Sequence, residues 1–94
     1  MTPDQIRDMI AEGRELVPGH LWPGLERYFV DRIEPGQFLV SFLSNDLMLA
    51  VGRADEVSFA ALPDLCKFLY NYAPALSHGS KAVMDAWLTA PVPA

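Results

Sequence analysis

The stretch from Glu34 to Asp55 constrains the fold most, because its apolar residues recur at helical spacing on both sides of a polar corner. Before the corner, apolar side chains fall three and four residues apart, as on one helix face: Phe38, Leu39, Phe42 and Leu43. Ser44-Asn45-Asp46 then interrupts the pattern with residue types that cap helices and close turns. A second apolar stripe runs from Leu47 to Ala54. The stretch therefore predicts two short helices joined by a tight corner.

The rest of the chain is helical by the same criteria. Thr2-Pro3-Asp4-Gln5 combines a capping box with a proline in the first turn, and predicts a helix that ends near Val17. Three more helices are expected from about His20 or Trp22 to Ile33, from Asp55 or Ser58 to Tyr72, and from Ser80 to Leu88. Pro63 lies inside the second of these three, where its missing N–H predicts a bend or break.

We therefore expect an all-α fold, a compact single-domain bundle of five to six short helices without a sheet. The 94 residues leave room for only one core, so residues 1–89 are predicted to form one helical domain and 90–94 a flexible tail. The periodicity predicts a core formed by Ile10, Leu25, Phe29, Phe38, Phe42, Leu47, Val51, Leu62, Cys66, Leu69 and Trp87.

Composition bears on the class of partner. Hydrophobic residues make up 51% of the chain, which is high for so small a sphere to hide, and this favours a homodimer or another partner surface. Twelve acidic against seven basic residues give a net charge of −5, which disfavours direct binding to nucleic acid. The helix pair 34–55 has the length of a helix-turn-helix, but Arg53 is the one basic residue of its second helix. An acidic surface that docks on a basic protein is favoured instead.

No residue pattern indicates a catalytic or metal-binding site. Cys66 falls on an apolar helix face, where a thiol usually packs as a small hydrophobe. His20 and His78 lack the carboxylate or cysteine spacing of a metal site, and no serine has the context of a nucleophile. We therefore expect no catalytic residue, no cofactor and no metal. No apolar run is long enough to span a bilayer and no secretory signal opens the chain, so we expect a cytoplasmic protein that does not bind a membrane.

Two groups of residues are predicted to bind a partner. The first is an acidic stripe on the first helix, formed by Asp4, Asp8, Glu12 and Glu15; the alternative is an ordinary solvated helix surface. The second comprises the aromatic residues Trp22, Tyr70 and Tyr72 near helix ends, since such residues often anchor interfaces; the alternative is that they close the core.

Several short segments resemble a family of small uncharacterised bacteriophage and prophage proteins. They are Gly24–Tyr28, Pro35–Leu39, Ser44–Leu47, Gly52–Asp55, Phe68–Pro74, Gly79-Ser80 and Ala86–Leu88, so the resemblance covers about residues 18–89. The family tends to carry a Cys-Trp pair before the closing Gly-Ser, whereas Ser77-His78 stands here, so a role of that loop does not carry over. The resemblance implies a viral accessory protein that acts in the bacterial host cell, and supplies no catalytic residues.

Small acidic phage proteins without evident chemistry include anti-CRISPR inhibitors, which act by binding a Cas protein. By analogy with that class, the resemblance implies a non-enzymatic protein that binds and inhibits a host protein with a basic surface, for example a Cas complex. The alternatives are a homodimeric phage structural or regulatory accessory protein, and a transcriptional cofactor.

Overall fold

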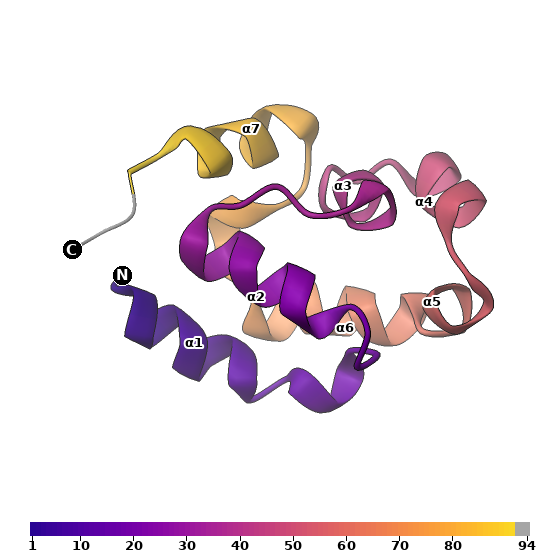
Figure 1. Cartoon of the computed structure of the whole chain (residues 1–94), viewed down its shortest axis with the longest axis horizontal. Helices are drawn as coiled ribbons and strands as arrows, with labels where there is room; N and C mark the ends of the chain where they lie inside the picture. The colour runs from indigo at the N-terminus through magenta and orange to yellow at the C-terminus, as the bar shows by residue number, and fades with distance from the viewer. Residues whose placement is uncertain (92–94) are drawn as a thin grey trace.

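The computed structural model describes residues 1–91 and folds them into helices alone, which confirms the all-α prediction (Figure 1). Within this range there are seven α-helices and two 3-10 helices, whereas five to six helices were predicted. They are α1 (Pro3–Ala11), η1 (Arg14–Leu16), α2 (Trp22–Asp31), α3 (Gln37–Leu43), α4 (Leu47–Arg53), α5 (Glu56–Ala60), α6 (Leu62–Tyr72), η2 (Ala75–Ser77) and α7 (Lys81–Thr89). The predicted tail, residues 90–94, lies mostly outside the described residues, and its flexibility stays a prediction.

The additional helix arises at Pro63. The segment predicted as one helix with a bend or break is divided at Ala61 into α5 and α6, and Pro63 occupies the first turn of α6. Proline is tolerated there because an N–H in the first turn has no partner within the helix. The break was therefore predicted in the right place, and it is complete enough to yield two helices.

Helix α1 begins as predicted and ends earlier. Its capping box is present: the Gln5 backbone N–H donates to Thr2 Oγ1 over 3.2 Å, and the Thr2 N–H donates to Gln5 Oε1 over 2.8 Å. The helix stops at Ala11 rather than near Val17. Just beyond its end, Gly13 packs against the ring of Tyr72, so closely that a Cβ atom would lie 2.6 Å from Tyr72 Cγ. Because Gly13 has no side chain, η1 can pack directly against α6.

The polar corner between α3 and α4 forms as predicted. Asn45 adopts a left-handed conformation with φ 62°, which asparagine tolerates better than most residues. Asp46 caps α4 by accepting a hydrogen bond from the Leu49 N–H over 3.2 Å. The two helices therefore form a tight pair at one end of the molecule (Figure 1).

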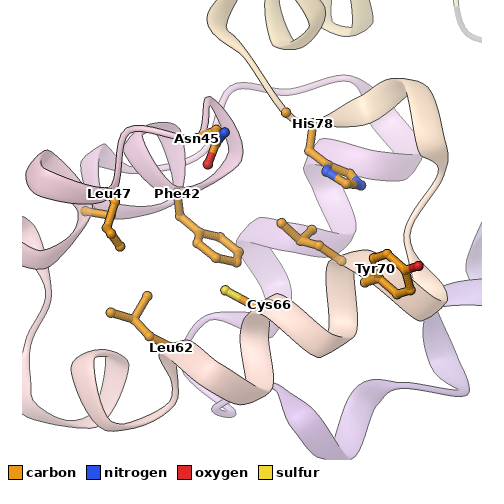
Figure 2. Close-up of a pocket in the computed structure, with 10 residues that line it drawn as sticks. Phe42, Asn45, Leu47, Leu62, Cys66, Tyr70 and His78 are labelled. Carbon is orange, nitrogen blue, oxygen red and sulfur yellow. The ribbon is translucent and has the colours of Figure 1, made fainter.

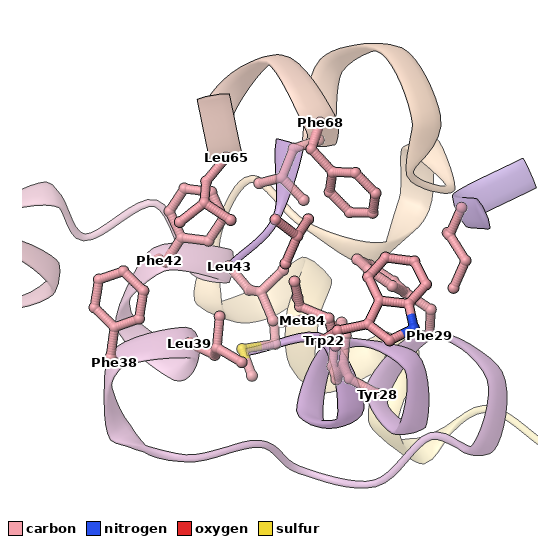
Figure 3. Packing of buried hydrophobic residues seen from close by; sticks show 14 of the residues in the cluster. Trp22, Tyr28, Phe29, Phe38, Leu39, Phe42, Leu43, Leu65, Phe68 and Met84 are labelled. Atoms are coloured by element: carbon pink, nitrogen blue, oxygen red, sulfur yellow. The ribbon is translucent and has the colours of Figure 1, made fainter. Parts of the chain in front are cut away.

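The core lies between α2, α3 and α6, with contributions from α1 and α7 (Figure 3). Phe68 is fully buried among other rings: its centroid lies 6.0 Å from that of Trp22 in a T-shaped arrangement, and 6.1 Å from that of Phe29 at a tilt of 45°. Leu25, Leu43 and Leu65 are fully buried as well. Helix α2 supplies five of the buried apolar side chains, α3 four and α6 three, so these three helices enclose most of the core.

Hydrogen bonds fasten the C-terminal segments to α2. The buried Tyr28 hydroxyl donates to the Ser77 carbonyl of η2, and burial raises the pKa of Tyr28 above its usual value. From α7, Trp87 Nε1 donates to the Tyr28 carbonyl over 3.0 Å, and the Arg32 guanidinium donates to the Trp87 carbonyl over 3.0 Å while stacking on its ring. Among residues 1–91, no helix has the length and apolarity needed to cross a membrane.

Candidate functional site

The first candidate surface is a row of three carboxylates, Asp4 and Asp8 on α1 and Glu12 at its C-cap, which we call the acidic row. The side chains of Ile6 and Ile10 are buried on the side of the helix that packs against the core. At 100° per residue, the acidic row lies directly opposite them, and all three carboxylates are exposed. The row therefore points straight into solvent, as the sequence pattern predicted.

Glu15 does not extend this row by helical periodicity. It is exposed, but it lies in η1 beyond the end of α1, because the helix stops before Gly13. The prediction that all four acids share one helix face is therefore wrong for Glu15. The one ion pair on the row joins Arg7 to Asp4 at 3.1 Å, and both side chains are largely exposed.

One of the three predicted aromatic anchors is buried and a second is partly buried. Trp22 is only 5% exposed, contacts Phe68, and is covered by the Arg14 guanidinium 5.2 Å from its ring centre. Tyr72 is partly buried, and its ring lies on Gly13. Both side chains pack against the core, and their role in binding a partner stays a prediction. Tyr70 is 89% exposed and is available to a partner.

The second candidate surface includes several residues that the sequence assigned to the core. Leu47 is 65% exposed, and Val51 and Cys66 are exposed as well, so their assignment to the core is wrong. Leu62 and Trp87 are only partly buried, and the other predicted core residues are buried. Leu47 and Cys66 line one pocket with Leu62 and Tyr70. At 100° per residue, Val51 and Met48 follow Leu47 within 100° of arc around the exposed side of α4. We call this surface the apolar face: Leu47, Met48 and Val51 of α4 and Leu62, Cys66 and Tyr70 of α6.

A groove runs through the apolar face between the α3–α4 pair and α6 (Figure 2). Its volume is about 310 Å³, and Phe42 and Cys66 lie in its middle, with Leu47 and Leu62 toward one end and Tyr70 and His78 toward the other. None of the ten lining residues is an Asp, Glu, Lys or Arg. Burial lowers the pKa of the half-buried His78, which keeps this imidazole neutral at pH 7.

Helix α4 is unusual for a surface helix. It reads Leu-Met-Leu-Ala-Val-Gly-Arg, yet only Ala50 is buried, and Met48 is 83% exposed. Its one charged residue, Arg53, turns back onto α3 and donates to Ser41 Oγ over 2.7 Å. The outward side of α4 is therefore uncharged. A helix that is apolar nearly all round normally has neighbours on most sides.

A third cluster brings together His20, Asp55 and Ser58, and the sequence analysis missed it. His20 Nε2 lies 3.0 Å from Asp55 Oδ2 and 3.3 Å from Ser58 Oγ, and the Ser58 N–H donates to Asp55 Oδ1 over 2.6 Å. Hydrogen bonds from Ser58, with a smaller contribution from His20, hold the pKa of Asp55 below its usual value. The spacing of Asp55 and Ser58 predicts a helix cap, but no local pattern indicates that His20 joins them.

This cluster does not have the geometry of a catalytic triad. In a triad the carboxylate accepts a hydrogen bond from one ring nitrogen of the histidine and so orients the ring, while the other nitrogen takes the proton of the hydroxyl. Here the carboxylate and the hydroxyl both approach Nε2, and Ser58 is buried. The cluster caps α5 and fastens it to the loop before α2. Within the described range, no group of three or more His, Cys, Asp or Glu could hold a metal ion.

The chain matches no family model, no curated protein and no solved structure. The resemblance to bacteriophage and prophage proteins therefore stays a prediction, and the surfaces described above carry the functional argument.

Proposed function

We propose that this protein is a non-enzymatic bacteriophage or prophage accessory protein that binds and inhibits a host protein with a basic surface, with a Cas complex as the leading candidate target. The observation that carries the proposal is the acidic row, Asp4, Asp8 and Glu12, aimed into solvent opposite the buried side of α1. The phage class of protein comes from the sequence resemblance alone.

The repulsion between the carboxylates of the acidic row supports its assignment to a partner-binding surface. Like charges one helical turn apart cost a helix a few tenths of a kcal/mol per pair, roughly 0.2–0.5. The pair between Arg7 and Asp4 is exposed at both ends and offsets little of that cost. A basic partner surface would remove the repulsion on binding. Charges of this kind mainly raise the association rate and make it sensitive to salt.

The test is to neutralise the row and Glu15 together, by Asp4→Asn, Asp8→Asn, Glu12→Gln and Glu15→Gln. The variant should keep its helix content and melting temperature, since the like-charge pairs are lost, and should bind far less target at low salt. Binding is measured by pull-down of purified Cas complexes, and function by phage survival on a CRISPR-immune host.

The matched control neutralises four exposed acids elsewhere, Asp31, Glu34, Glu56 and Asp64, with the same change in net charge. This control should keep target binding and phage protection. Equal activity of the native and row-neutralised proteins would show that the acidic row is an ordinary solvated surface. The aromatic residues, of which Tyr70 is exposed, would then be the predicted partner-binding group.

A second candidate function is a homodimeric structural or regulatory accessory protein of a phage, and the exposed apolar face favours it. Gene order separates the two functions, because a neighbouring helix-turn-helix regulator favours the inhibitor and a virion assembly cluster favours the structural role.

A further inference from the structure

We propose that the apolar face is the interface of a homodimer, in which α4 of each copy packs into the groove between α4 and α6 of the other. The proposal does not depend on the identity of any host target, because it rests on the area, the charge and the shape of this face.

The exposed apolar area is large for a small monomer. Leu47, Met48, Val51 and Tyr70 are between 40% and 89% exposed. Together they present roughly a few hundred Å² of apolar surface, the size of the largest patch on a typical monomer, and patches of this size commonly mark an interaction site.

The absence of charge selects a second copy over a basic partner. The chain carries a net charge of −5, so two copies repel one another wherever acidic residues face each other. No lining residue of the groove carries a full charge, and Arg53 is turned away into its own α3. Two copies can therefore meet on the apolar face without repulsion. A basic protein would find no carboxylate in the groove.

The shape of the apolar face complements itself. Leu47 of α4 lines the groove together with Phe42 and Cys66 (Figure 2). By helical spacing, Val51 and Met48 continue the exposed apolar side of α4 from Leu47, and we expect them to form a ridge beside the groove. A two-fold axis repeats any contact between ridge and groove, so each copy fills the groove of the other. Such an isologous contact closes the assembly at two chains rather than extending it into a fibre.

Sedimentation velocity over a wide range of concentrations tests the oligomeric state. The native protein is expected at twice the chain mass of 10.4 kDa, and Leu47→Glu at the mass of one chain. The matched control is Leu76→Glu, because Leu76 is 76% exposed but lies on η2, away from the apolar face; it should stay dimeric. Met48→Lys gives a second dimer-breaking variant at a side chain so exposed that folding does not need it.

Cross-linking tests the proposed packing directly. Cys66 is the only cysteine and is exposed on the apolar face, so the cross-linking variants are made in a Cys66→Ser background, where Met48→Cys leaves one defined thiol in each chain. A short bismaleimide should join two Met48→Cys chains efficiently, and should join far fewer chains of Ala11→Cys, whose new thiol lies on α1. A monomeric native protein at every concentration, or a dimer that survives Leu47→Glu and Met48→Lys, would overturn the proposal. A failure to bind Cas complexes would leave it intact.

Discussion

Gly13→Ala offers the sharpest test of the packing between the N-terminal segment and α6. A Cβ atom at position 13 would lie 2.6 Å from Tyr72 Cγ and 2.8 Å from Phe68 Cδ1, and both atoms belong to rings held in or beside the core. The backbone there, with φ −101° and ψ 7°, is open to alanine. The substitution therefore changes packing without straining the backbone.

The magnitude follows from two opposed effects. Forcing a methyl group into a packed site costs about 1–3 kcal/mol. Replacing a glycine by alanine in a permitted conformation returns about 0.4–1 kcal/mol by restricting the unfolded chain. We expect a net loss of about 1–2 kcal/mol, which for a domain of this size lowers the melting temperature by roughly 5–15 °C. Thermal denaturation followed by circular dichroism, at one fixed protein concentration, measures it.

Gly19→Ala is the matched control, because a Cβ at position 19 meets nothing within 4 Å. This variant should melt at the native temperature or slightly above it. Removing the ring in the double variant Gly13→Ala/Tyr72→Ala should recover part of the loss, as a coupling energy of about 1 kcal/mol. A native melting temperature for Gly13→Ala would refute the close approach of Tyr72 to the N-terminal segment.

Two further predictions concern the groove. Phe42→Ala should lower the free energy of unfolding by about 3 kcal/mol, the low end for a buried phenylalanine, because the groove already leaves one side of the ring open; a change below about 1 kcal/mol in urea denaturation would remove Phe42 from the core. Burial holds the pKa of His78 below the usual histidine value of about 6.5, so the folded state binds fewer protons than the unfolded state. Stability should be complete above about pH 6.5 and decline as the pH falls through the folded-state pKa; the decline should be smaller in His78→Gln, and equal declines would contradict this role.

The sequence predicted the helices well because their signals are local. The capping box of Thr2 and Gln5, the cap of Asp46 and the break near Pro63 each depend on residues within one helical turn. The early end of α1 could not be predicted in this way. It coincides with the contact between Gly13 and Tyr72, which lie far apart along the chain. For the same reason, the link from His20 to Asp55 has no local signal.

The errors in the predicted core have a different physical cause. Periodicity identifies the apolar side of a helix, but it does not say whether that side is covered by the same chain or by another molecule. Leu47, Val51 and Cys66 follow the helical pattern as well as Leu25 and Phe29 do, yet the first three are exposed. In a homodimer, an apolar helix face can be exposed in the single chain and buried by the second copy. Interfaces of obligate homodimers therefore resemble a protein core divided in two.

Helix α1 lies toward one end of the long axis and α4 toward the other, while α6, which carries the rest of the apolar face, lies between them (Figure 1). A dimer formed through the apolar face therefore carries one acidic row toward each of its outer ends. A target with a single basic patch would bind only one acidic row of the dimer, and the second acidic row would not increase its affinity. A target that repeats its basic patch at a matching distance would engage both ends, and the second contact would form at the effective concentration set by the first. Self-association and inhibition would then be coupled, although they use separate residues: breaking the dimer with Leu47→Glu would weaken binding to a repeated target while leaving every carboxylate of the acidic row in place.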